Sequence, residues 1–259
     1  MIDLHCHVLP GLDDGPPRMQ DALALARVAV ASGTTTLVAT PHIDNHWNVN
    51  PSDVRRAAAM LAQECKTEGI ALDIRTGGEI DLARLADLDP DELDAVRLGD
   101  GPYLLLECPL SPTAGDFDVL MRSIHSRGQP ILLAHPERSP LLQREPERLI
   151  RLVEAGLLCS ITAGSLRGQF GEHVRQFTLE MLREGLVHDV ASDCHDHLRR
   201  PPGLADALDD VAREIPGIGG QSEWLTRLAP AAILAGEELP SRPQMSHIEM
   251  FSDSAEDWS

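Results

Sequence analysis

Histidine and acidic residues recur along the chain in patterns that suit metal binding. The segment HCH places His5 and His7 two positions apart, so that on a strand both imidazoles lie on one face and can chelate one ion. Further segments carry the same residue types: TPH with His42, GGE with Glu79, LECP with Glu107, AHPER with His135, and ASDCH with Asp193 and His195. Neutral imidazole and carboxylate together suit zinc, manganese or iron. The residues therefore predict a metal cluster.

The elements that must position these residues alternate between two types. Short apolar runs predict strands at 2–5, 34–40, 72–76, 104–107, 131–134, 158–162 and 187–191. Runs with helical spacing predict helices at 16–31, 51–68, 117–126, 147–155, 172–184 and 204–212, with a terminal helix at 225–234. Strands that alternate with helices form parallel sheets, and the carboxyl ends of such strands meet at one edge, where active sites are built. We expect the ligand-type residues to converge there.

The number of strand and helix units bears on the fold. Seven units in about 220 residues fit a distorted (β/α)7 barrel of the α/β class better than two separate domains, and an open doubly wound sheet is the alternative. We predict one domain over residues 1–240. After Pro240 the chain loses its periodicity and is acidic, so residues 241–259 are predicted to form a disordered tail.

Composition excludes several classes of function. The chain has 41 acidic and 22 basic residues, a net charge of −19, and only 3% aromatic residues. Proteins that bind nucleic acids neutralise phosphates with basic faces and stack bases on aromatic rings, so nucleic acid is not expected as a partner. No apolar run approaches the roughly 20 residues of a membrane-spanning helix. The five cysteines include no CxxC pair and fit reduced thiols, and together with the polar N-terminal segment they predict a cytoplasmic protein.

Several longer motifs resemble the PHP (polymerase and histidinol phosphatase) superfamily. The motifs are MIDLHCHVLPGLDDGP, ATPH, GGEI, LLECP, ILLAHPER, ITAGSLRGQFG and VASDCH, and the resemblance runs from Met1 to about Pro240. Within the superfamily, the LDDGP, HPER and AGSL…FG blocks are most similar to the manganese-dependent protein-tyrosine phosphatases of bacterial capsule and exopolysaccharide operons. The resemblance implies a distorted (β/α)7 barrel, related to the TIM barrel, with a trinuclear metal centre at its carboxyl rim.

The resemblance also implies how the ligands are shared. Carried over residue by residue, they are expected to divide among three ions, the first held by His5, His7, Glu79 and Asp193, the second by Glu79, Glu107 and His135, and the third by His42, His195 and an aspartate of the LDDG turn. That aspartate is Asp14 or its neighbour Asp13, at a place where other PHP branches tend to have histidine. Three divalent ions are expected, manganese first, with iron or zinc as alternatives.

A phosphomonoester is a dianion, so a site that binds it needs cations. In the implied reaction a metal-bridged hydroxide attacks phosphorus in line, while the third ion and an arginine hold the remaining oxygens. Arg138, three residues after His135, is the first candidate because a guanidinium fork matches two phosphate oxygens. Arg199 and Arg200 are the second candidates. The alternative for each arginine is an ordinary surface salt bridge.

One cysteine and one arginine have the spacing of a different, thiol-based mechanism. Cys194 and Arg200 satisfy the C-x5-R spacing of cysteine-dependent tyrosine phosphatases. The intervening HDHLR has no glycine for a backbone phosphate cradle, and Cys194 lies between two expected metal ligands, so the thiol mechanism is rejected.

The predicted function is therefore metal-dependent hydrolysis of phosphotyrosine. The expected substrate is the phosphotyrosine-bearing tail of a bacterial tyrosine kinase that regulates capsular or extracellular polysaccharide synthesis. One alternative is a PHP-type small-molecule phosphatase such as histidinol phosphatase, and a second is a non-catalytic metal-binding PHP domain. The sequence predicts no membrane insertion and leaves the oligomeric state open.

Overall fold

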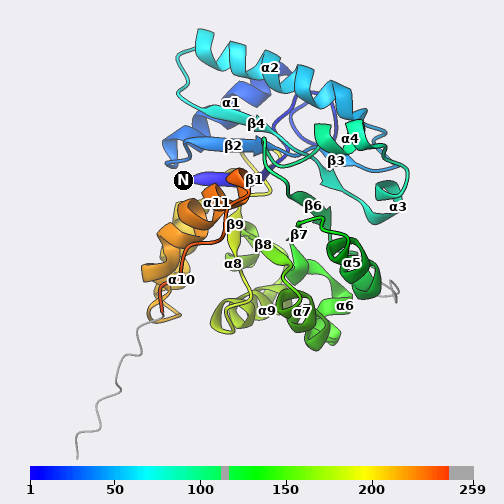
Figure 1. Ribbon diagram of the computed structural model, residues 1–259. Helices are drawn as coiled ribbons and strands as arrows, with labels where there is room; N and C mark the ends of the chain where they lie inside the picture. Colours follow the sequence, from blue (N-terminus) through cyan, green and yellow to red (C-terminus); the bar gives the residue numbers. More distant parts are fainter. Residues whose placement is uncertain (112–116, 245–259) are drawn as a thin grey trace, which may run out of the picture.

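The computed structural model describes residues 1–111 and 117–244, and within them helices surround two sheets of parallel strands (Figure 1). The smaller sheet has the order β1-β2-β4, with β1 at Ile2–Cys6, β2 at Thr36–Ala39 and β4 at Asp73–Thr76. The larger sheet has the order β3-β5-β6-β7-β8-β9, with β3 at His42–Ile43, β5 at Glu79–Ile80, β6 at Leu104–Glu107, β7 at Ile131–Ala134, β8 at Leu158–Thr162 and β9 at Asp189–Ala191. The α/β class with parallel strands is confirmed.

The chain passes from the smaller sheet to the larger one at two places, between β2 and β3 and between β4 and β5. Of the predicted strand 34–40, residues Thr36–Ala39 form β2, whereas β3 at His42–Ile43 lies beyond it and was not predicted. Pro41, which lies between the two strands, has no N–H to donate to a ladder. Between β4 and β5, a Cβ atom on Gly78 would lie 2.7 Å from the Ile43 side chain, so the close approach of the two segments requires glycine.

The first and last strands lie side by side. Cys6 pairs with Cys194 in an isolated parallel bridge, and the His7 N–H donates to the Cys194 carbonyl at 2.9 Å. The two sheets therefore meet where β1 lies beside the end of β9. Closure of the strands into one barrel stays a prediction.

The longer helices follow the sequence pattern closely. They are α1 Met19–Ala31, α2 Pro51–Thr67, α5 Phe117–Ser126, α7 Pro146–Glu154, α9 Glu172–Arg183 and α10 Leu204–Ala212. In α2, the side chain of Asn50 caps the helix by accepting from the Ser52 N–H at 2.9 Å. The helix predicted from residue 16 begins only at Met19, because Pro16 lies in a turn whose carbonyl accepts from the Gly11 N–H.

Shorter helical segments went unpredicted. They are α3 Leu82–Leu85, α4 Pro90–Ala95, α6 Pro140–Arg144, α8 Ala163–Leu166, and the 3-10 turns Pro136–Arg138 and Ile218–Gln221. The predicted terminal helix at 225–234 is a π-helical segment, Trp224–Leu228, that continues into α11 Ala229–Ala235. None of the described helices has the length and apolar character needed to cross a membrane.

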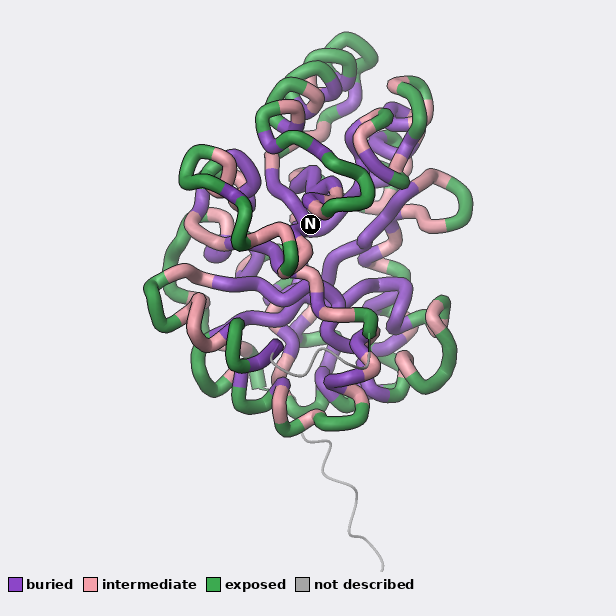
Figure 2. Tube along the Cα trace, turned by 90° about the vertical axis from the view of Figure 1, so that its right-hand side faces the viewer, coloured by how far each residue is buried: buried purple, intermediate pink, exposed green. Residues whose placement is uncertain are grey.

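Buried segments occupy the centre of the molecule and exposed ones its periphery (Figure 2). Most residues of the central strands are buried, as expected for parallel strands covered on both faces. A main core packs strands against helices, and a smaller one consists of Leu4, Val38, Leu98, Leu105, Leu132, Ala134, Leu158 and Ile233. Two apolar cores fix the strand positions, and with them the polar residues at the strand ends.

The end of the described chain packs on the rest of the protein. Arg242 donates to the carbonyls of Gly185 at 2.7 Å and Val187 at 2.9 Å, and Trp224 Nε1 donates to the Pro240 carbonyl at 2.8 Å. Residues 245–259, most of the predicted tail, lie outside the described residues. The domain boundary at 240 stays a prediction.

Candidate metal centre

The structure gathers the predicted ligand residues at the carboxyl edge of the strands. Most lie in or directly after neighbouring strands: His5 and His7 with β1, His42 in β3, Glu79 in β5, Glu107 in β6, His135 after β7, and Asp193 and His195 after β9. Asp14 joins them from the loop before α1. Parallel pairing brings these ends to one edge. The side chains form overlapping groups of three or four residues whose ligand atoms lie within 4.8 Å of one another.

The innermost group contains His5, His7, Glu79 and Asp193. The Nε2 atoms of His5 and His7 lie 3.2 Å apart, and each is 3.3 Å from Glu79 Oε2. Asp193 Oδ1 is 3.6 Å from His5 Nε2 and 3.5 Å from His7 Nε2. All four side chains are buried. Two imidazoles and two carboxylates thus direct ligand atoms into one small buried volume.

A second group forms on the other oxygen of Glu79. Its Oε1 lies 2.7 Å from His135 Nε2, which is 3.9 Å from Glu107 Oε1. Burial, followed by the charges of Glu79 and Asp81, raises the pKa of Glu107 to about 8. A nearby cation would remove this penalty on the ionised carboxylate.

A third group is more open to solvent. Asp14 Oδ1 lies 3.2 Å from His195 Nε2 and 3.6 Å from His42 Nε2, and its side chain is 42% exposed. Burial acts to raise the pKa of Asp14. The hydrogen bond from His195 and the charge of His195 outweigh burial and lower the pKa of Asp14 to about 2. His42 Nδ1 is 3.1 Å from Glu79 Oε2, so this group is continuous with the innermost one.

The donor set fits divalent metal ions. Glu79 Oε2 is buried and has no hydrogen-bond partner in the described structure, although imidazole nitrogens of His5, His7 and His42 lie within 3.3 Å of it. His42 Nδ1 also lacks such a partner. Buried polar atoms are normally satisfied, so these unpaired atoms mark places where a cation would bind. Imidazole and carboxylate together suit manganese, iron or zinc.

The two aspartates of the LDDG turn have different surroundings. Asp13 Oδ2 accepts from His7 Nδ1 at 2.7 Å and from the His42 N–H at 3.0 Å, and Asp13 Oδ1 accepts from the Gly15 N–H at 3.0 Å. Asp13 therefore lies behind the cluster, where it orients His7, in the way that a carboxylate commonly supports a metal-binding histidine. Asp14 lies in the cluster, with His42 and His195.

Two residues of the cluster have a backbone conformation that residues other than glycine seldom adopt. His135 has φ of 34° and Asp193 has φ of 49°, both in the left-handed region. Each is held by a hydrogen bond of its backbone, His135 N–H to the Ser160 carbonyl and Asp193 N–H to the His5 carbonyl, both at 2.9 Å. Strained backbone of this kind concentrates at functional sites.

Two of the three candidate arginines reach the cluster. Arg138 Nη1 lies 2.8 Å and Arg200 Nη2 2.7 Å from the same oxygen, Asp193 Oδ2. Arg199 instead has an exposed side chain, and among its described hydrogen bonds is one from its backbone N–H to Asp196 Oδ1 at 2.5 Å. Arg138 and Arg200 therefore form the cationic side of the cluster.

The rejected thiol arrangement has no support in the geometry. Cys194 is fully buried, and its Sγ lies 2.8 Å from Cys6 Sγ. Arg200, the second member of the C-x5-R spacing, turns to Asp193. All five cysteines are free and buried.

Sequence reasoning missed Glu137 and Phe170. The buried Glu137 Oε1 accepts from the Thr162 N–H at 2.9 Å and from Ser165 Oγ at 2.7 Å, which ties the HPER motif to the AGSL motif. The Phe170 ring lies against Arg138, with 4.3 Å between the ring centroid and Arg138 Cζ. These two residues belong to the HPER and AGSL…FG motifs, which meet in space, so the motifs themselves were the sequence signal that could have identified them.

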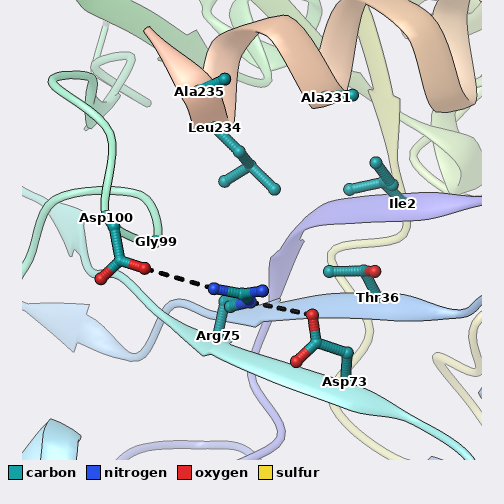
Figure 3. Close-up of a pocket in the computed structure, with 9 residues that line it drawn as sticks. All are labelled: Ile2, Thr36, Asp73, Arg75, Gly99, Asp100, Ala231, Leu234 and Ala235. Atoms are coloured by element: carbon teal, nitrogen blue, oxygen red, sulfur yellow. Dashed lines mark hydrogen bonds and ion pairs between the residues drawn. The ribbon is translucent and has the colours of Figure 1, made fainter.

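A pocket at the opposite ends of the strands is a poor alternative site. It lies among the first residues of β1, β2 and β4 and is covered by α11 (Figure 3). Its cation, Arg75, already pairs with Asp73 at 2.8 Å and with Asp100 at 3.2 Å. Ile2, Leu234 and alanines supply much of the remaining wall, so the pocket has no group suited to phosphate chemistry.

Comparison with known proteins identifies relatives along most of the chain. The chain is 37% identical over 215 residues to the tyrosine-protein phosphatase YwqE of Bacillus subtilis, covering 83% of this chain and 85% of the relative. It is 29% identical over 213 residues to the putative tyrosine-protein phosphatase CapC of Staphylococcus aureus, covering 81% and 83%.

Solved structures agree with the sequence relatives. A crystal structure from work on YwqE of Bacillus subtilis and CpsB of Streptococcus pneumoniae, described as metal-dependent tyrosine phosphatases, superposes with a TM-score of 0.84 at 33% identity, covering 95% of this chain and 99% of that chain. A β-aspartyl dipeptidase from Fervidobacterium islandicum, at 14% identity, has a TM-score of 0.60 over 90% of this chain and 72% of that chain, which shows likeness of fold alone. Residues 1–223 match the family described as capsular polysaccharide synthesis, CpsB/CapC, and the chain belongs to that family.

Proposed function

We propose that this protein is a metal-dependent protein-tyrosine phosphatase. The observation that carries the proposal is the convergence of buried imidazoles and carboxylates on Glu79 and Asp193, with two arginines on the adjoining Asp193 oxygen. The activities named for YwqE and CpsB, which are tyrosine phosphatases, support it.

The proposed division of the metal ligands is the one that the resemblance implies. The overlapping side-chain groups support it in part, since Glu107 also groups with His42 and Glu79, and His135 also groups with His5 and Glu79. His5, His7, Glu79 and Asp193 would hold a first ion, Glu79, Glu107 and His135 a second, and Asp14, His42 and His195 a third. Manganese is proposed, with iron or zinc as alternatives. When bound, such ions supply Lewis acidity and lower the pKa of a water molecule toward neutrality.

The protein's own groups bind and orient the substrate. Arg138 and Arg200 come from different segments, and their guanidinium forks match the oxygens of a phosphoryl group. The net charge of −19 repels a phosphorylated substrate at long range, so binding depends on a local cationic region. These two arginines are part of that region. A phenolate leaving group needs little protonation, so no strong general acid is assigned.

Four finer proposals accompany the function. The strands close into a distorted (β/α)7 barrel, which the contact of Cys6 with Cys194 supports. Residues 1–240 form the catalytic domain, and the rest is a tail. The protein works in the cytoplasm, which its five free cysteines support. Its substrate is the phosphotyrosine-bearing tail of a bacterial tyrosine kinase, which the capsule family supports.

One assay with matched substrates tests the function. The purified protein, loaded with manganese, is given a phosphotyrosine peptide or histidinol phosphate, with and without a chelator. We expect hydrolysis of the peptide, its loss on chelation and its return with manganese. Glu79→Gln should abolish turnover, whereas Glu147→Gln, an exposed residue of α7, should not. A preference for histidinol phosphate would favour the small-molecule alternative, and no hydrolysis of either would favour a non-catalytic domain.

A further inference from the structure

The Phe170 ring lies within cation–π range of both arginines of the candidate metal centre. The centre of its ring is 4.3 Å from Arg138 Cζ and 5.8 Å from Arg200 Cζ. Arg138 belongs to the 3-10 turn after β7, and Arg200 belongs to the loop after β9. The ring is therefore an apolar surface shared by two cations that come from separate parts of the chain.

To bind a phosphoryl group, the two guanidinium groups must be held in place by a contact that leaves some of their N–H groups free. Both donate to Asp193 Oδ2, Arg138 at 2.8 Å and Arg200 at 2.7 Å, so two positive charges converge on one oxygen. An aromatic ring attracts a guanidinium through its face, and a stacked guanidinium keeps its edge available for hydrogen bonds. Among the described hydrogen bonds, Arg138 uses only Nη1 and Arg200 only Nη2. Each therefore keeps N–H groups for a ligand.

Glycines in the segment around Phe170 set the backbone conformation that places its ring beside the arginines. Gly168 and Gly171 have φ of +74° and +96°, in the region that favours glycine. A Cβ atom on Gly164 would collide with the Gln169 side chain and would lie 3.2 Å from Phe170 Cε2, so this position leaves room for Gln169 and for the ring. α8 is in turn bonded to the residue before Arg138, through Ser165 Oγ and Glu137 Oε1 at 2.7 Å.

We propose that Phe170 is a positioning residue, which holds the guanidinium groups of Arg138 and Arg200 so that their free edges meet a phosphoryl group at the metal centre. The inference rests on the proposed function and adds to it the group that orders its phosphate-binding arginines. Phe170 acts through the two arginines.

The test compares Phe170→Leu with Phe170→Tyr in the full chain loaded with manganese. Binding of inorganic phosphate is measured by isothermal titration calorimetry, alongside turnover of a phosphotyrosine peptide, metal content and melting temperature. Phe170→Leu should weaken phosphate binding by about tenfold, and Phe170→Tyr, which keeps the ring, should stay within about twofold of wild type. Metal content should not change in either variant. Wild-type affinity in Phe170→Leu, or an equal loss in Phe170→Tyr, would overturn the inference.

A double variant separates positioning from a general effect on stability. In an Arg138→Gln background the loss caused by Phe170→Leu should shrink, because the ring then acts only on Arg200. An undiminished loss in that background would contradict a role through Arg138. If wild type binds phosphate but hydrolyses no phosphotyrosine, the proposed function fails while the phosphate measurements still decide the role of Phe170.

Discussion

The Nε2 atoms of His5 and His7 face each other at 3.2 Å, with side chains that are almost completely buried. On the far side of the His7 ring, Nδ1 lies 2.7 Å from Asp13 Oδ2. The proton on the neutral ring then sits on Nδ1, and the lone pair of Nε2 points into the cluster. A lone pair on His7 Nε2, close to a second imidazole nitrogen and to the Glu79 and Asp193 carboxylates, suits the binding of a cation.

Replacing the two aspartates of the LDDG turn should have different consequences. Asp14→Asn should remove one metal ion per chain, because Asp14 is the carboxylate that joins His42 and His195. Asp13→Asn should lower metal affinity by about 10- to 100-fold through the orientation of His7. Metal content after dialysis, followed by titration with manganese, distinguishes the two. Identical metal binding in both variants and wild type would contradict these roles.

Adjacent arginines provide a matched pair of variants. Arg200→Ala should lower kcat/KM for a phosphotyrosine peptide by about 100-fold, because it removes one of the two guanidinium groups proposed to hold the phosphoryl oxygens. Arg199→Ala should stay within about twofold of wild type, since Arg199 has an exposed side chain. Steady-state kinetics of both variants, at equal metal content, provide the measurement. An equal loss in the two would mean that the site extends over Arg199.

Cys194→Ser separates the metal mechanism from a thiol mechanism. The Cys194 thiol is fully buried against Cys6, so we expect its replacement to leave kcat within about threefold of wild type. Turnover and metal content are measured together on the purified variant. Loss of turnover with the metals still bound would revive the thiol mechanism.

His188 makes stability depend on pH away from the metal centre. Burial, and then the charge of Arg242, lower the pKa of His188 to about 4, from an ordinary value of 6.5. Its neutral Nδ1 accepts from the Cys159 N–H at 3.1 Å. Between these two pKa values the unfolded chain binds a proton that the folded chain does not, so this stabilisation is present above pH 6.5 and is lost as the pH falls toward 4.

Urea unfolding of His188→Asn checks that assignment. The asparagine amide oxygen can accept the same hydrogen bond but does not titrate. From about pH 7 to about pH 4.5, the unfolding free energy of wild type should therefore fall more than that of the variant. Parallel pH dependences for the two proteins would show that His188 is not the source.

Much of the fold and the general place of the site could be predicted from sequence. Parallel strands bring their carboxyl ends to one edge, so a ligand-type residue after nearly every predicted strand was enough to predict convergence. The strand β3 after Pro41 was missed, since its two residues are too few to give a strand pattern in the sequence.

The different roles of adjacent residues depend on which way the local backbone turns each side chain, and the sequence motifs do not show this. Asp13 and Asp14 differ because the turn directs the first toward His7 and the second toward His195. Likewise, the side chain of Asp196 accepts from the Leu198 and Arg199 N–H groups and so sets the turn that directs Arg200 back to the cluster.

Anomalous scattering from crystals of the metal-loaded protein tests the central claim most directly, because it counts the metal ions and identifies their ligands. We predict three peaks at the carboxyl edge of the strands, one among His5, His7, Glu79 and Asp193, one among Glu79, Glu107 and His135, and one among Asp14, His42 and His195. Fewer than two peaks at this edge would contradict the proposed metal centre and the mechanism that depends on it.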